Sequence, residues 1–180
     1  GRANGTFAGV ATLAIGHIGQ KDNENEQFRS KSCHMSITVA PTGQACGAVV
    51  TGIDLSQELS AETVAELRAT WLQYHVLSFP DQTLSDDDLE RFSLCFGEFG
   101  ADPFIAPIAG REHVISVQRL ANEKAPLFAE NWHTDWSFKE HPPAGTCLLA
   151  ITIPPHGGDT LFANQHLAYK NLPDALKQKV

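Results

Sequence analysis

The most informative stretch of the chain is Asn131–Phe138, which reads NWHTDWSF. Side chains alternate faces along an extended strand, so we expect His133 and Asp135, two positions apart, to project to the same side. An imidazole nitrogen beside a carboxylate oxygen suits a divalent metal such as Fe(II), Mn(II) or Zn(II), and one more histidine would complete a 2-His-1-carboxylate face. The stretch therefore predicts two metal ligands and leaves the third open.

Composition excludes several classes of protein. The chain has 180 residues, 42% of them hydrophobic, which is enough for one domain with a sizeable core. Its net charge of -8 argues against a broad nucleic-acid or anionic-membrane surface, because those partners need clustered Lys and Arg. No apolar run approaches the roughly 20 residues that span a bilayer. Four dispersed cysteines without a CxxC motif indicate a reducing compartment, so we expect a cytoplasmic protein.

Residues 1–34 differ from the remainder of the chain. A weakly apolar run of small residues, Phe7–Ile18, is followed by a polar run, and the single methionine, Met35, directly precedes a strand-like alternation. We therefore expect Met35 to be the natural initiator and residues 1–34 to be non-native or translated upstream sequence, disordered and outside the fold. A targeting peptide is the alternative, which Gly9 and Gly16 weaken by interrupting the apolar run.

The next segment predicts alternating strands and helices. Strands are expected at 36–40 and 45–50 around a turn, and again at His75–Phe79, where Pro80 closes the run. Ser60 is a predicted helix N-cap, and Ser85 begins a second helix that should reach about Phe96. The apolar face of the first helix is expected to contain Val64, Leu67, Trp71 and Leu72.

Three successive aspartates, Asp86–Asp88, could be mistaken for a metal site. Acidic groups at a helix start are favoured by the helix macrodipole, and neighbouring helical positions face different directions. We therefore interpret these residues as a helix start.

The second half is richer in strand signals. Strands are expected at Val114–Val117, Thr146–Ile153 and Thr160–Phe162, and helix from Gln165 onward with a further turn or helix at Pro173. The chain is therefore predicted to be mainly β with flanking helices, an α+β class.

Four blocks of sequence resemble a known family. Phe96-Gly97-Glu98, Asn131–Asp135, Pro142–Gly145 and Gly157–Leu161 stand in the order and spacing of the taurine dioxygenase family. These proteins are Fe(II)- and 2-oxoglutarate-dependent dioxygenases. The resemblance covers about residues 36–180 and implies a double-stranded β-helix, or jelly roll, that is incomplete at the C-terminus. Residues 35–180 would then be the N-terminal part of a dioxygenase domain.

The resemblance also implies roles for individual residues. His133 and Asp135 would be the first two iron ligands, and Thr160 would donate a hydroxyl to the distal carboxylate of 2-oxoglutarate. The second ligand histidine and an arginine for the same carboxylate would lie beyond Val180. His141, His156 and His166 have no strand spacing that matches the family, so we do not expect any of them to be the third ligand.

Two departures concern the substrate. In the taurine enzymes of the family that this chain resembles, a histidine and an asparagine face the sulfonate. The corresponding positions of this chain hold Asp102 and Ala129. An acid near a sulfonate repels it and alanine supplies no amide, so taurine itself is not the expected substrate. Trp136 adds a bulky apolar wall, and Phe138 is expected to line the same site. We expect a substrate that is less anionic at that end, or more aromatic, than taurine.

The resemblance implies that the full-length protein oxidises a C–H bond of a small organic substrate with O2 and 2-oxoglutarate, giving succinate and CO2. One alternative is a catalytically incomplete fragment or pseudoenzyme, which is how we expect the 180 residues to behave alone. Another is a zinc- or manganese-dependent hydrolase or a cupin-like enzyme that uses the same pair. His133 could also be a structural histidine of the core. Neither a nucleic acid nor a membrane is an expected partner, and a homo-oligomer is left open.

Overall fold

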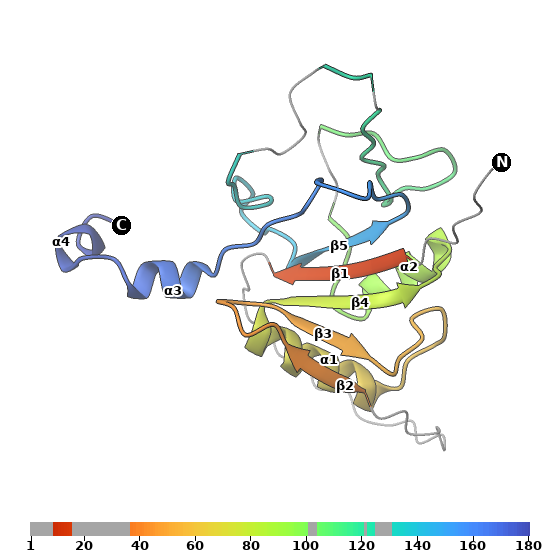
Figure 1. The fold of residues 1–180 in the computed structure, drawn as a ribbon, viewed down its shortest axis with the longest axis horizontal. Helices are drawn as coiled ribbons and strands as arrows, with labels where there is room; N and C mark the ends of the chain where they lie inside the picture. Colours follow the sequence, from red (N-terminus) through yellow and green to blue (C-terminus); the bar gives the residue numbers. More distant parts are fainter. Residues whose placement is uncertain (1–8, 16–36, 101–103, 121, 125–130) are drawn as a thin grey trace.

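The computed structural model describes residues 9–15, 37–100, 104–120, 122–124 and 131–180 (Figure 1). Its centre is a five-stranded sheet in the order β2-β3-β4-β1-β5. The strands are β1 (Gly9–Ile15), β2 (Thr38–Pro41), β3 (Ala48–Thr51), β4 (Val76–Gln82) and β5 (Gly145–Ala150), and the helices are α1 (Ala61–Tyr74), α2 (Asp86–Leu94), α3 (Gln165–Lys170) and α4 (Asp174–Lys177). Neighbouring strands are antiparallel except β3 and β4, which are parallel. The mixed sheet with helices agrees with the predicted α+β class.

The second and third strands form the predicted hairpin. β2 and β3 pair from Thr38 with Thr51 to Pro41 with Ala48. The Thr42 amide donates to the Gly47 carbonyl over 3.0 Å and closes the connection. Both strands begin or end within three residues of the expected positions, because alternation and the Pro-Thr-Gly turn fix this local structure.

One hydrophobic core joins the sheet to α1 and α2. Its buried residues are Ala48, Val50, Ile53, Leu55, Leu67, Trp71, Leu77, Phe79, Phe92 and Phe96. Three ring pairs in edge-to-face contact link α1 and β4 to α2 and the residues that follow it: Trp71–Phe96, Phe79–Phe92 and Phe92–Phe96. Since such rings bury large apolar areas, this cluster holds both helices against the same face of the sheet.

Helix α1 starts at its predicted cap. The Ser60 hydroxyl accepts from the Thr63 amide over 3.1 Å, and the helix ends at Tyr74, followed by His75, whose φ of 65° is left-handed. Leu67 and Trp71 are buried, but the prediction for Leu72 is wrong, since that side chain is 48% exposed. Position 72 is adjacent to Trp71 and turns about 100° away from it around the helix axis.

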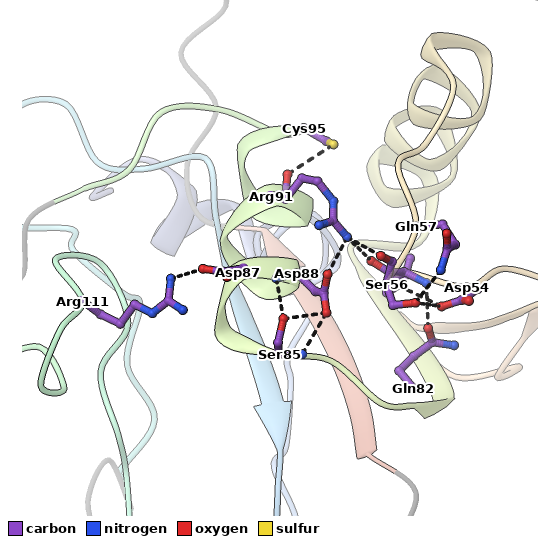
Figure 2. Close-up of polar contacts among 11 residues, drawn as sticks. Asp54, Ser56, Gln57, Gln82, Ser85, Asp87, Asp88, Arg91, Cys95 and Arg111 are labelled. Atoms are coloured by element: carbon purple, nitrogen blue, oxygen red, sulfur yellow. Dashed lines mark hydrogen bonds and ion pairs between the residues drawn. The ribbon is translucent and has the colours of Figure 1, made fainter.

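Strand β4 does not stop at Pro80 as expected but continues to Gln82. Its pairing with β1 shifts between the partners Phe79 and Gln82, so Pro80 lies at a bulge where its missing N–H costs no ladder bond. The Gln82 side chain is buried and satisfies the backbone of the neighbouring segment (Figure 2). Its Oε1 accepts from the Leu55 amide over 2.9 Å, and its Nε2 donates to the Ile53 carbonyl over 3.1 Å.

Helix α2 begins with a complete capping box. The Asp88 amide donates to the Ser85 hydroxyl, and the Asp88 carboxylate accepts from the Ser85 amide over 2.9 Å. The other two aspartates pair with Arg111, which also bonds to Glu90 over 2.9 Å. The interpretation of Asp86–Asp88 as a helix start is therefore confirmed. The helix ends at Leu94, two residues before the expected limit.

Two predicted strands of the second half are wrong. Residues 114–117 and 160–162 are irregular, and β5 ends at Ala150 instead of Ile153. Val114 uses its carbonyl for the Ile108 amide, which closes a loop over 2.9 Å. A β-prone run forms a strand only where a partner strand satisfies its backbone, and none of the described segments lies beside these two runs as a partner.

Strand β1 belongs to residues 1–34, the segment that we expected from the sequence to lie outside the fold. Gly9–Ile15 lies between β4 and β5 and pairs antiparallel with both (Figure 1). The segment therefore contributes a strand to the described sheet. The expectation that residues 1–34 are non-native or upstream sequence remains a prediction.

The C-terminal helices α3 and α4 lie where a helix and a further turn or helix were predicted, and they project away from the sheet (Figure 1). The side-chain Nδ2 of Asn164 donates to the Ala45 carbonyl over 2.8 Å, and His166 stacks on His75 with ring centroids 5.5 Å apart. Among the helices of the described residues, none has the length and apolar character to cross a membrane.

Candidate metal centre

His133 and Asp135 stand side by side in the structure. Nε2 of His133 lies 3.1 Å from Oδ1 of Asp135, and the side chains are 50% and 43% exposed. The two residues singled out from the sequence therefore present a nitrogen and an oxygen to the same point at the surface.

A backbone carbonyl orients the imidazole. Nδ1 of His133 lies 2.8 Å from the carbonyl oxygen of Asn131. Because a carbonyl only accepts, Nδ1 carries the proton, and Nε2 is the nitrogen left to bind a cation. Facing Nε2 is a carboxylate oxygen, so a proton or a metal ion between the two atoms would satisfy both.

The separation of the two atoms fits adjacent ligands of one metal. Ligand atoms that each lie about 2.1 Å from a metal ion, at right angles, are about 3.0 Å apart. The 3.1 Å between Nε2 of His133 and Oδ1 of Asp135 matches this value. One imidazole nitrogen and one carboxylate oxygen suit Fe(II), Mn(II) or Zn(II). Within the described ranges, no group of three or more His, Cys, Asp or Glu side chains is placed to hold a metal ion.

The local backbone differs from the expected extended strand. Residues 132–134 are irregular, and a turn starts at Asp135. Trp136 has a φ of 59°, and its carbonyl accepts from the Lys139 amide over 2.9 Å. The two ligand candidates share a side because the imidazole folds back to the Asn131 carbonyl. Strand alternation is not the cause.

Strand β5 contacts the pair through a hydroxyl. Oγ1 of Thr146 donates to Oδ2 of Asp135 over 2.8 Å. The sequence placed Thr146 in a strand and assigned it no role. The only signal in the sequence for this contact is a hydroxyl residue soon after the Pro142-Pro143 block. That signal does not reveal that the hydroxyl contacts Asp135.

Aromatic side chains and a proline surround the turn that follows Asp135. The indole of Trp136 and the ring of Pro143 lie against Gly100, and the ammonium of Lys139 stands 4.3 Å from the indole centroid. Phe138 makes an edge contact with Phe104, with centroids 5.7 Å apart. An open cavity of about 310 Å³ lies beside this wall, lined by Gly97, Glu98, Phe99, Gly100, Lys139, His141, Pro142, Pro143 and Ala144.

The remaining predicted site residues are placed differently. Asp102 and Ala129 lie outside the described residues. Thr160 is exposed in an irregular segment, and within the described part of the chain no hydrogen bond or ion pair joins it to His133 or Asp135. Of the other histidines, His166 stacks on His75, whereas His141 lines the cavity.

Comparison with known proteins gives a consistent picture. The model of the family "Taurine catabolism dioxygenase TauD, TfdA family" matches residues 38–180. An alpha-ketoglutarate-dependent sulfate ester dioxygenase of Pseudomonas putida is 32% identical over 145 residues, covering 80% of this chain and 47% of its own. An (S)-phenoxypropionate/alpha-ketoglutarate-dioxygenase of Sphingobium herbicidovorans is 30% identical over 144 residues, covering 79% and 50%.

A solved structure shows the same likeness. The crystal structure of a taurine dioxygenase from Burkholderia xenovorans superposes with a TM-score of 0.64 at 34% identity and covers 80% of this chain and 50% of its own. The chain thus spans about half the length of the relatives it matches. Residues 9–15, which form β1, lie before the matched region.

Proposed function

Because the chain belongs to the TauD, TfdA family of taurine catabolism dioxygenases, we propose that the full-length protein is an Fe(II)- and 2-oxoglutarate-dependent dioxygenase. The observation that supports this best is the His133–Asp135 pair. Its donor atoms lie 3.1 Å apart, and a carbonyl fixes the imidazole so that Nε2 faces the shared point. Histidine and carboxylate leave open positions for a co-substrate and O2 when a third protein ligand completes the face.

The proposed reaction is the one that membership of this family implies. One C–H bond of the substrate becomes C–OH, while 2-oxoglutarate and O2 give succinate and CO2, so one oxygen atom enters each organic product. The bound iron supplies this oxidation chemistry, and the protein supplies binding and orientation. His133 and Asp135 hold the metal, and Asn131 fixes the imidazole through its carbonyl. Thr160 is proposed to donate its hydroxyl to the distal carboxylate of 2-oxoglutarate.

The fold and location of the full-length protein are part of the same proposal. The sheet with α1 and α2 would be one portion of a jelly roll that the remaining half completes. Cys46, Cys95 and Cys147, the cysteines within the described residues, are free thiols, which suits a reducing cytoplasm. The 180 residues alone are proposed to be inactive, since the family's second ligand histidine is expected beyond Val180.

The proposed substrate is a small organic molecule that is less anionic or more aromatic than taurine. Trp136 and Phe138 are next to the ligand pair in the sequence. The indole of Trp136 contacts Lys139, which lines the cavity, and the ring of Phe138 contacts Phe104. Asp102 and Ala129 replace the two groups that would face a sulfonate. The relatives' own names include both a phenoxypropionate and a sulfate ester dioxygenase. A panel of phenoxyacetates, alkyl sulfates and taurine therefore tests this point, and turnover of taurine with micromolar affinity would contradict it.

The metal assignment is tested with the full-length protein. Anaerobic addition of Fe(II) and 2-oxoglutarate should produce the visible charge-transfer absorption of an iron chelate, and O2 with substrate should then give succinate. His133→Ala and Asp135→Ala should lose both signals, whereas the control His156→Ala, at an exposed bend, should keep them. Turnover of wild-type magnitude in either ligand variant would overturn the assignment. Activity that needs zinc but neither O2 nor 2-oxoglutarate would favour a hydrolase.

A further inference from the structure

The two oxygens of the Asp135 carboxylate have different partners. Its Oδ1 faces Nε2 of His133 over 3.1 Å, and its Oδ2 accepts the hydroxyl of Thr146 over 2.8 Å. A carboxylate bound in this way offers one oxygen, and not two, at the point where the imidazole nitrogen also arrives.

The Asp135 carboxylate keeps its two oxygens in these positions only if another group restricts its rotation. The side chain of Asp135 is 43% exposed, and the bond between Cβ and the carboxylate has a broad, roughly two-fold rotational preference. Water could therefore hydrogen-bond either oxygen and let the group turn. The Thr146 hydroxyl restricts that rotation by holding Oδ2.

Thr146 is well placed to act as such a constraint. It belongs to β5, where it pairs with Ala14 of β1. The next residue, Cys147, packs against the hydrophobic core, and burial raises the pKa of its thiol. Because neighbouring strand residues point to opposite faces, β5 is anchored by Cys147 on one face and presents Thr146 on the other. Threonine is also β-branched, so few rotamers are open to its hydroxyl.

We propose that Thr146 is a positioning residue, which holds Asp135 as a one-oxygen ligand. This inference rests on the proposed function, since it concerns how one metal ligand is oriented. A carboxylate that bound through both oxygens would occupy one of the positions that the co-substrate and O2 need. Hydrogen bonds to ligating carboxylates tune metal affinity, and removing such partners typically costs about 10–100-fold.

The test measures metal binding without turnover. Full-length Thr146→Val, Thr146→Ser and wild type are titrated with Co(II) against a competing chelator, and the Co(II) absorption spectrum is recorded. The valine variant should bind about 10-fold more weakly and show an altered spectrum. The serine variant should return to within about threefold of wild type, because it restores the hydroxyl. Thr51→Val, an exposed threonine of β3, is the matched control and should leave affinity unchanged.

The outcomes separate this inference from the proposed function. If His133→Ala binds Co(II) as tightly as wild type, the metal site itself is wrong. If His133→Ala loses binding while Thr146→Val keeps wild-type affinity and spectrum, only the role of Thr146 is refuted. Urea unfolding checks that the valine variant is folded. Should it not fold, Thr146→Ala provides the same comparison, and unchanged binding in that variant equally overturns the proposal.

Discussion

Gly100 lies directly against the indole of Trp136. A Cβ atom on Gly100 would stand 3.0 Å from Cζ3 of Trp136 and 3.2 Å from Cγ of Pro143, closer than real Cβ contacts normally come. Three blocks that are separate in the sequence therefore meet at Trp136, the residue that follows Asp135: the glycine after the Phe-Gly-Glu motif, the turn after Asp135 and the Pro-Pro segment. A glycine at position 100 allows this close approach.

Gly100→Ala should therefore displace Trp136. We expect a loss of about 1–2 kcal/mol in the free energy of unfolding, which is typical of overpacking, measured by urea denaturation. In a Trp136→Leu background the same change should cost clearly less, because the clashing ring is gone. Additive effects of the two substitutions would show that positions 100 and 136 do not contact each other.

Gln82 ties the bulge in β4 to the segment before α1 (Figure 2). Gln82→Leu leaves the Leu55 amide and the Ile53 carbonyl without their side-chain partner in a buried site. We expect about 2–4 kcal/mol of destabilisation, since each unsatisfied buried group costs about 1–3 kcal/mol. Gln73→Leu, on the exposed side of α1, is the control and should stay within about 0.5 kcal/mol in the same urea experiment. Equal effects of the two changes would contradict this role.

The capping box makes the free energy of unfolding depend on pH in the acidic range. Hydrogen bonds from the Ser85 hydroxyl and amide, together with Arg91, lower the pKa of Asp88 from 3.8 to about 2. A carboxyl whose pKa is lower in the folded state stabilises the fold above the unfolded pKa, and this contribution is lost as protons bind. Stability should therefore fall between about pH 4 and pH 2. Asp88→Asn should flatten this part of the urea-unfolding profile, whereas an unchanged slope would exclude Asp88 as the cause.

Arg111 fixes the loop after Phe104 to the start of α2 (Figure 2). Hydrogen bonds and charges of Asp87 and Glu90 raise its pKa, so it stays a cation at any accessible pH. Arg111→Gln should speed amide hydrogen exchange in residues 104–120 while leaving exchange in β4 unchanged. Arg119→Gln is the control, because Arg119 pairs with Glu123, which lies outside α2, over 3.9 Å. Faster exchange in β4 as well would indicate general destabilisation instead of release of the loop.

Local signals account for the elements that were predicted well. The hairpin of β2 and β3, the Ser60 and Ser85 caps and the helix after Asn164 each depend on residues within a few positions of one another. Runs that needed a distant partner were predicted less well. Residues 114–117 and 160–162 have strand composition but no partner within the described sheet. Pro80 was expected to end the strand, but β4 continues through a bulge opposite β1, and β1 lies about 70 residues earlier in the chain.

The sequence by itself determined the family of the chain and singled out the two residues that we propose as metal ligands, because four ordered blocks and a His-x-Asp motif are properties of the linear chain. Tertiary structure alone decided how that pair is held. The imidazole turns to the Asn131 carbonyl, and Thr146 reaches Asp135 from β5. Gly100 lies against the ring of Trp136, which is 36 positions later in the chain. These contacts join residues through packing and hydrogen bonds in space, and spacing along the chain does not encode the direction in which a side chain turns.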